Sequence, residues 1–146
     1  MLAIGFDFGL RRIGVAVGSR LGGQARALTT VGYQGKHPDW ARLQEIVAEW
    51  KPDRLVVGLP YNIDGSESEI SRAARRFAGR LQERCRIHVE LVDERLSSRE
   101  AEQRLKTQRR SGSRKKRVQA ADVDQEAAAV ILQGWLDQAS QQGVEE

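Results

Sequence analysis

The chain has 146 residues, of which 40% are hydrophobic and 30% charged, as in an ordinary globular domain. This length predicts one domain over residues 1–140 with a disordered tail at 141–146, and argues against a two-domain enzyme that closes on its substrate. No stretch approaches the roughly 18 apolar residues of a membrane span, and no basic leader precedes Leu2, so we expect a cytoplasmic protein. The single cysteine, Cys85, excludes an internal disulfide and is expected to be a buried structural thiol.

Positive charge is concentrated in one segment. Lys and Arg exceed Asp and Glu by 24 to 20, yet residues 104–117 hold eight basic residues and no acid, which leaves 16 basic against 20 acidic residues elsewhere. A basic cluster on a mildly acidic body is typical of a nucleic-acid surface, because neutralising phosphates releases condensed counterions. The alternative is a solvated basic loop without a ligand.

The first third of the chain is predicted to form an antiparallel meander. Apolar alternation and a Gly22-Gly23 turn signal predict three strands, over Leu2–Phe8, Ile13–Gly18 and Ala27–Tyr33. The rest alternates helices and strands: a helix over Pro38–Trp50, a strand over Leu55–Leu59, a helix from the Ser66–Glu69 capping box to Arg84, and a strand over Ile87–Val92. A second capping box at Ser97–Glu100 opens a helix to about Gln108, and a last helix covers Asp122–Ala139.

This order predicts an α/β fold with a five-stranded mixed sheet, three antiparallel strands followed by parallel ones, flanked by helices. The last helix is expected to turn one side to the core, with Val123, Ala127, Val130, Ile131, Gly134 and Trp135. The three tryptophans, at helical spacings, are interpreted as core anchors rather than as base-stacking platforms.

Asp7 is the first candidate functional residue, because it lies in a hydrophobic strand between Phe6 and Phe8. An unpaired carboxylate buried there would cost several kcal/mol. Three compensations are open: a basic partner such as Arg11 or Arg12, backbone donors of the turn after Gly9, or a cation shared with other acids.

At two further places in the chain, two neighbouring acids are alternative candidates for a site residue. Asp93 and Glu94 end the last strand and point to opposite faces, and the strand pattern favours Glu94, which is in phase with Glu90 and Val92. In the last helix, Asp124 falls in the middle of the apolar arc, whereas Asp122 shares its face with Glu126 and Gln133. Asp93 or Glu94 could instead be a charge at the N-terminus of the next helix, and in the last helix a simple first-turn acid fits Asp122 well and Asp124 poorly.

Three inward carboxylates without a histidine or thiol set would make an oxygen-rich site, which favours Mg²⁺ or Mn²⁺ over Zn²⁺. Such a site can activate water for hydrolysis of a phosphodiester. The basic segment before the last helix would hold the nucleic-acid backbone, with these candidate contacts: Arg109, Arg110, Arg114, Lys115, Lys116 and Arg117.

Four motifs in order along nearly the whole chain resemble the bacterial YqgF (RuvX) family, described both as Holliday junction resolvases and as pre-16S rRNA nucleases. They are Gly5-Phe6-Asp7-Phe8-Gly9 with Arg12–Ala16, Val57–Pro60 with Asp64-Gly65, Asp93–Ser97, and Val123-Asp124-Gln125 with Ile131-Leu132-Gln133.

The resemblance implies a ribonuclease H-like fold and acidic site residues at Asp7, Glu94 and Asp124. It implies a nuclease acting on precursor ribosomal RNA or branched DNA. A phosphate contact by Arg12, which belongs to the first motif, is our own hypothesis. Asp122 remains a nearby substitute for Asp124, and the sequence leaves open whether the protein is a monomer or a homodimer.

Two other functions are open. One is a binding module without turnover, whose acids stabilise the fold through Arg12 or Arg95. The other is an ATPase of the sugar-kinase type, suggested by Asp7-Phe8-Gly9.

Overall fold

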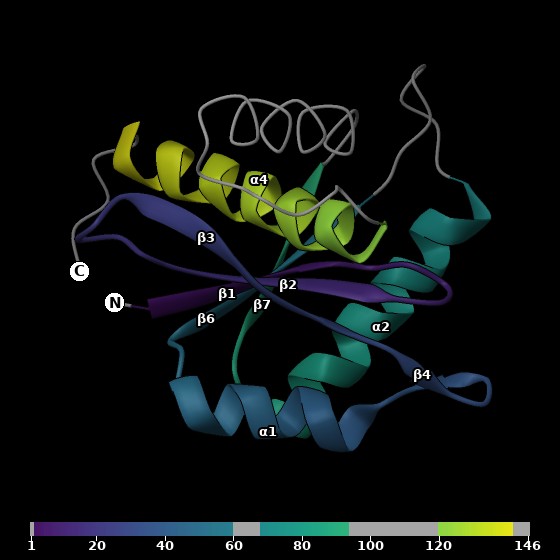
Figure 1. Ribbon diagram of the computed structural model, residues 1–146. Coiled ribbons are helices and arrows are strands. Elements are labelled where there is room, and N and C mark those ends of the chain that lie inside the picture. Colours follow the sequence, from purple (N-terminus) through teal and green to yellow (C-terminus); the bar gives the residue numbers. More distant parts are fainter. Residues whose placement is uncertain (1, 60–67, 94–119, 142–146) are drawn as a thin grey trace.

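The computed structural model describes residues 2–59, 68–93 and 120–141. In this part of the chain a five-stranded sheet has the order β3-β2-β1-β6-β7. Helix α4 (Ala120–Gln141) covers one face, while α1 (Trp40–Trp50) and α2 (Glu69–Cys85) cover the other (Figure 1). Among the described residues, no helix is long and apolar enough to cross a membrane.

The strand order confirms the predicted mixed sheet. β1 (Leu2–Asp7) pairs antiparallel with β2 (Ile13–Ser19), which pairs antiparallel with β3 (Gln24–Val31). On its other side β1 pairs parallel with β6 (Arg54–Leu59), and β6 pairs parallel with β7 (Val89–Asp93). The helix predicted to end near Gln108, the basic segment and most of the predicted tail lie outside the described residues.

The segment after β3 differs from the prediction. The third strand ends at Val31, and a two-stranded hairpin of β4 (Tyr33–Gln34) and β5 (His37–Pro38) follows. Gly35 has a φ of +65°, a left-handed conformation that suits glycine and permits this tight turn. Helix α1 therefore begins two residues after Pro38, where the Asp39 side chain accepts a hydrogen bond from the backbone N–H of Arg42.

Helix α2 starts later than predicted. Its N-cap is Ser68 rather than Ser66, and the capping box is closed by the Ser71 side chain instead of Glu69. Ser68 Oγ accepts from the Ser71 N–H, and Ser71 Oγ accepts from the Ser68 N–H. A serine at the third helical position therefore takes the part that Glu69 was expected to have. Cys85, at the end of α2, is a free thiol that is half-buried rather than fully buried.

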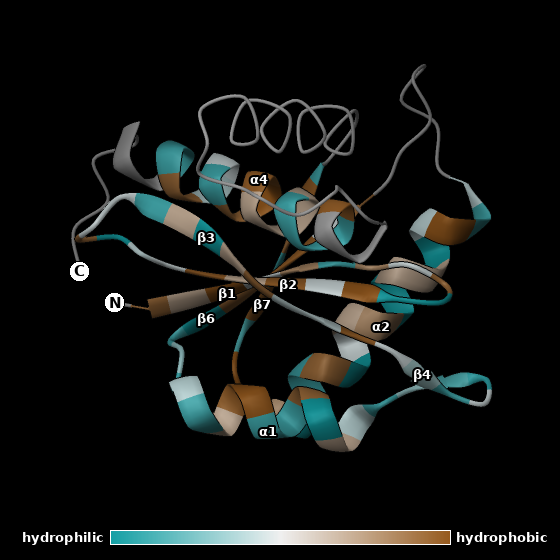
Figure 2. Ribbon diagram, viewed as in Figure 1, coloured by the Kyte–Doolittle hydropathy of each residue, from teal (hydrophilic) through white to brown (hydrophobic). Residues whose placement is uncertain are grey.

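The two faces of the sheet differ in side-chain size. Large residues of β1, β2 and β6 pack against α1 and α2, which both combine hydrophobic and hydrophilic residues (Figure 2). The α4 face instead carries small residues, including Ala3, Gly5, Ala16 and Ala25. A Cβ atom on Gly5 would lie 2.8 Å from the Leu132 Cβ, so α4 rests directly on the strands.

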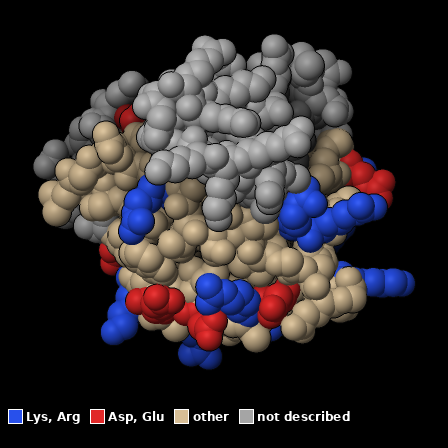
Figure 3. All heavy atoms as spheres, viewed as in Figure 1, with Lys and Arg blue, Asp and Glu red and all other residues tan. Residues whose placement is uncertain are grey.

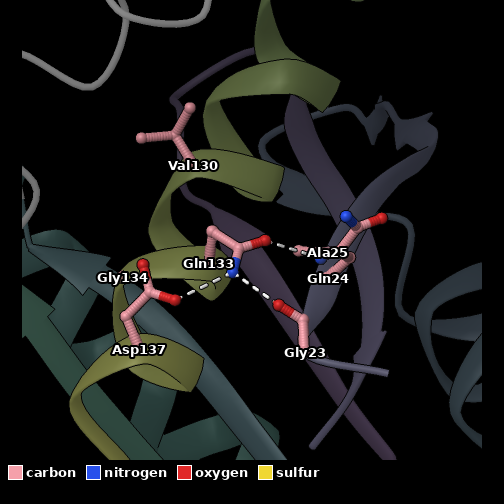
Figure 4. A pocket seen from close by; sticks show the side chains of 7 residues that line it. All are labelled: Gly23, Gln24, Ala25, Val130, Gln133, Gly134 and Asp137. Carbon is pink, nitrogen blue, oxygen red and sulfur yellow. Dashed lines mark hydrogen bonds between the residues drawn. The ribbon is translucent and has the colours of Figure 1, made fainter. Parts of the chain in front are cut away.

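Helix α4 is fastened to the edge strand β3 by Gln133 (Figure 4). Its Oε1 accepts a hydrogen bond from the Ala25 N–H at 2.8 Å, and its Nε2 donates to the Gly23 carbonyl at 2.8 Å and to Asp137 Oδ1 at 3.0 Å. The side chain thus pairs with backbone groups of an edge strand, which lack a neighbouring strand on that side.

The buried side of α4 agrees in part with the expected one. Ala127, Ile131 and Trp135 are buried as predicted, whereas Gly134 is exposed and Val130 lines an open pocket beside Gln133. Leu132 and Leu136 are buried as well. The expectation that Glu126 faces outward is also wrong, since that residue is only 7% exposed. Residues 126–129 are all buried, and four consecutive positions span every side of a helical turn, so an amphipathic pattern does not apply there.

Candidate active site

Asp7 is the last residue of β1 and is half-buried. Side chains alternate along a strand, and Gly5 faces Ala128 and Leu132 of α4, so Asp7 lies on the α4 face as well. Its cross-strand neighbour is Gly14 of β2. The carboxylate therefore stands at the end of the central strand, on the side covered by the last helix.

Gly14 places Asp124 next to Asp7. A Cβ atom on Gly14 would lie 1.9 Å from the backbone oxygen of Asp124 and 2.4 Å from its carbonyl carbon, so only glycine allows α4 to approach this closely. Asp7 and Asp124 are distant in sequence, yet the main chains of both adjoin the same glycine. The structure thus brings two of the three predicted acids to one end of the sheet.

Arg12 contacts Asp124 at this end. The Arg12 Nε donates to Asp124 Oδ2 at 2.6 Å, with 46% of the arginine side chain and 22% of the aspartate side chain exposed. Arg12 was one of the partners considered for Asp7, and the structure gives it to Asp124. One edge of the guanidinium is engaged, and an arginine has five N–H donors, so others remain for a ligand.

The remaining predicted site residues lie outside the described part of the chain. Glu94 follows directly after β7, where Val92 packs against the α4 cluster and Asp93 is exposed. The preference for Glu94 over Asp93 stays a prediction. The side chain of Asp122 and the basic residues Arg109, Arg110, Arg114, Lys115, Lys116 and Arg117 are also not described.

Carboxylate oxygens are the ligands that Mg²⁺ and Mn²⁺ prefer, so Asp7 and Asp124 fit such an ion in their chemistry. Within the described ranges, however, no three His, Cys, Asp or Glu residues come close enough to hold a metal. A third ligand would have to come from elsewhere in the chain, and Glu94 is the predicted one.

Sequence reasoning did not single out Gly14 or Tyr33. An isolated glycine within a strand is a known sign of close backbone approach, so the signal for Gly14 was present. Tyr33 carried no such signal. Its hydroxyl donates to the Gly9 carbonyl at 2.7 Å, which fixes the loop between β1 and β2, and burial raises the pKa of this hydroxyl.

A family model described as "RuvX: Holliday junction resolvase" matches residues 1–138. The chain belongs to the RuvX family. A relative from Azotobacter vinelandii, named "Putative pre-16S rRNA nuclease", is 48% identical over 136 residues, which are 92% of each chain. A relative of the same name from Pseudomonas putida is 47% identical over 137 residues, 93% of this chain and 94% of that protein.

Solved structures share the fold at low sequence identity. RuvC from Thermus thermophilus has a TM-score of 0.58 and 17% identity, and the match covers 98% of this chain and 97% of that protein. The yeast mitochondrial Holliday junction resolvase Ydc2 has a TM-score of 0.55 and 12% identity, with 95% of this chain and 79% of that protein covered. These resolvases place the chain in the predicted ribonuclease H-like fold class.

Proposed function

We propose that the protein is a divalent-metal-dependent nuclease that hydrolyses phosphodiester bonds of structured nucleic acid, and that its substrate is the 5′ end of pre-16S rRNA. The observation that carries the proposal is the convergence of Asp7 and Asp124 on Gly14. Asp7 stands at the end of the central strand β1, and Asp124 stands in the helix that covers this end of the sheet. The names of the RuvX relatives support nuclease chemistry and the RNA substrate.

Asp7, Asp124 and Glu94 would hold Mg²⁺ or Mn²⁺. When bound, such an ion activates water and stabilises the leaving oxygen of a phosphodiester. The chain's own contribution is positioning. Main-chain contact with Gly14 fixes the start of α4, and the Arg12 Nε orients the Asp124 carboxylate. The exposed Arg12 guanidinium would offer its other N–H groups to a substrate phosphate.

The basic segment before α4 would hold the nucleic-acid backbone. We assign this role to Arg109, Arg110, Arg114, Lys115, Lys116 and Arg117, on the strength of their density in the sequence. This segment directly precedes, in the sequence, the helix that carries Asp124. Phosphate contacts in the segment would therefore be made by residues that precede an active-site acid in the chain. These basic residues would bind nucleic acid and not a membrane.

Two other functions have an observation in their favour. The family description favours a four-way DNA junction as substrate, and a symmetric junction would call for a homodimer, whereas trimming an RNA end needs one site in a monomer. The ion pair of Arg12 with Asp124 favours a binding module without turnover, in which the acid serves stability.

The deciding experiment compares cleavage of labelled precursor ribosomal RNA and of a synthetic four-way DNA junction in Mg²⁺, Mn²⁺ or EDTA. It uses the wild type, Asp7→Asn, Asp124→Asn and the control Glu45→Gln, which alters an exposed acid of α1. Cutting of the RNA that needs a metal and both aspartates would support the proposal. Cutting of the junction alone would move the substrate to DNA. Binding without cutting in every metal would overturn the nuclease.

A further inference from the structure

A pocket lined by basic and aromatic side chains lies on the face of the sheet opposite α4. It is a pocket of about 230 Å³ between α2 and the β4–β5 hairpin, here named the α2 pocket. Its walls include four aromatic side chains, Phe8, Tyr33, Trp40 and Phe77, and the basic side chains of Lys36, Arg76 and Arg80. This volume is below the roughly 300–1,000 Å³ of pockets for drug-sized ligands, and suits a single ring system.

The aromatic walls are held rigidly. The Trp40 ring stacks on Phe77 with centroids 5.4 Å apart, and the Arg84 guanidinium lies 4.6 Å from the Trp40 ring centroid. The Tyr33 hydroxyl is fixed by the Gly9 carbonyl. Trp40 thus packs against the core as predicted, yet its half-buried side chain also lines the α2 pocket. Phe77 is buried, and Phe77 and Arg84 cover the Trp40 ring, so the half-buried Tyr33 ring is the aromatic surface on which a nucleobase would stack.

The basic walls belong to a row of arginines on α2. Arg72, Arg76, Arg80 and Arg84 recur every four residues, so they share one side of the helix. Like charges at this spacing destabilise a helix by about 0.2–0.5 kcal/mol per pair. Arg72, Arg76 and Arg80 are exposed and form no ion pair with any residue of the described ranges. Basic side chains project on the side of the molecule where α2 and β4 lie (Figures 1 and 3).

The loop between β1 and β2 connects this pocket with the candidate active site. Phe8 and Leu10 line the α2 pocket, while Asp7 and Arg12 of the same segment lie at the acidic site. Asp7 and Phe8 are consecutive residues whose side chains point to opposite faces of the sheet. Leu10, which lies in this loop, is 63% exposed. A nucleic-acid strand bound across this loop would contact both the α2 pocket and the candidate active site.

We propose that the α2 pocket receives one unpaired nucleobase of the substrate strand, and that Arg76 and Arg80 bind the phosphates on either side of it. The inference rests on the proposed nuclease function, because it places this nucleotide in the single-stranded flank of the cleaved bond. An aromatic wall beside arginines that form no ion pair within the described ranges is the kind of arrangement by which single-stranded nucleic acids are held without sequence preference.

The test measures binding of a fluorescein-labelled single-stranded RNA in EDTA by anisotropy, so that it does not depend on cleavage. The double variant Arg76→Gln/Arg80→Gln is compared with Arg42→Gln/Arg54→Gln, which removes two exposed, ion-paired arginines away from the α2 pocket. Loss of two phosphate contacts should lower the slope of log K against log salt by about 1.4, since each contact to a single strand contributes about 0.7. The control pair should keep the wild-type slope.

A second arm addresses the nucleobase. Tyr33→Ala should weaken RNA binding about tenfold through the lost aromatic wall, whereas Tyr33→Phe, which keeps the ring, should bind like the wild type. A wild-type slope in the Arg76→Gln/Arg80→Gln protein would overturn the proposal and point the arginine row to an acidic protein. If Arg76 and Arg80 contribute to salt-sensitive RNA binding but the protein cuts no substrate, the α2 pocket proposal is supported and the proposed nuclease function is rejected.

Discussion

The Arg12 Nε lies 2.6 Å from Asp124 Oδ2, and this contact joins the segment before β2 to the start of α4 across 112 residues of sequence. Nearly half of the arginine side chain is exposed, and exposed ion pairs contribute only about 0–1 kcal/mol to stability. The pair is therefore a weak stabilising device and a good means of fixing the direction of one carboxylate.

Asp124→Asn should separate the catalytic role of this residue from its structural one. We expect the free energy of unfolding to fall by no more than about 1 kcal/mol, because the lost ion pair is solvent-screened. Under the proposed function, cleavage should fall by at least about 100-fold, since Asp124 is a proposed metal ligand. Urea denaturation and the cleavage assay measure the two effects. A large loss of stability, without metal binding in calorimetry, would instead favour the binding module.

Gly14→Ala should strongly destabilise the protein, because the new methyl group would collide with the Asp124 main chain. We expect a loss of about 3 kcal/mol in the free energy of unfolding, measured in urea, together with loss of cleavage as α4 is displaced. Gly134→Ala is the matched control. Gly134 lies in an exposed helix interior with nothing within 4 Å of an added Cβ, so alanine should stabilise by about 1 kcal/mol. Equal effects of the two substitutions would refute the close approach.

Tyr33 should make stability sensitive to strongly alkaline pH. Burial raises its pKa in the folded protein above the usual 10.0, so its contribution is fully present below pH 10. As pH rises further, the unfolded chain loses this proton first, and stability declines until the folded pKa is passed. Tm measured from about pH 8 to pH 11 should therefore fall more steeply in the wild type than in Tyr33→Phe.

Tyr33→Phe should also cost about 1 kcal/mol at neutral pH, because the hydrogen bond to the Gly9 carbonyl is lost. Parallel Tm curves for the two proteins throughout the alkaline range would contradict the assigned burial of the hydroxyl.

Gln133→Ala should loosen the edge strand β3 from α4. The substitution removes the hydrogen bonds to Gly23 and Ala25, and we expect a loss of about 1–2 kcal/mol in urea denaturation. Hydrogen exchange of the Ala25 amide should become faster. Gln138→Ala, at an exposed position of the same helix, should change stability by less than about 0.5 kcal/mol. Unchanged exchange at Ala25 in Gln133→Ala would show that this bond does not protect β3.

The sheet could be predicted because its signals are local: apolar alternation in most strands, and a short continuous apolar run at Leu55–Leu59. The β4–β5 hairpin was missed because its strands are two residues each, too short for any alternation to be read. The N-cap is Ser68 and not Ser66 because two serines only two residues apart can both cap a helix, and the choice depends on where the helix packs.

The site was predicted less completely than the fold. The Asp124 main chain lies against Gly14 and its carboxylate contacts Arg12, and the inward role of this carboxylate stays a prediction. The periodicity misplaced Val130 and Gly134, which packing leaves outside the core. The choice of Arg12 as the partner of Asp124 rather than Asp7 depends on a contact between the two ends of the chain, which no local pattern encodes. The arginine row of α2 was visible in the sequence, and its relation to Tyr33 and Trp40 required the fold.

The main-chain contact at Gly14 has a consequence for how this protein can be altered. A backbone-to-backbone contact sets the place of the Asp124 main chain, so no large core side chain lies between the sheet and this residue. Redesign of the large residues under α1 and α2 could therefore raise or lower thermal tolerance while the acidic end keeps its geometry. Conversely, a library aimed at new substrates should leave Gly14 untouched and vary the exposed loop at Leu10, where changes alter the surface and not the scaffold.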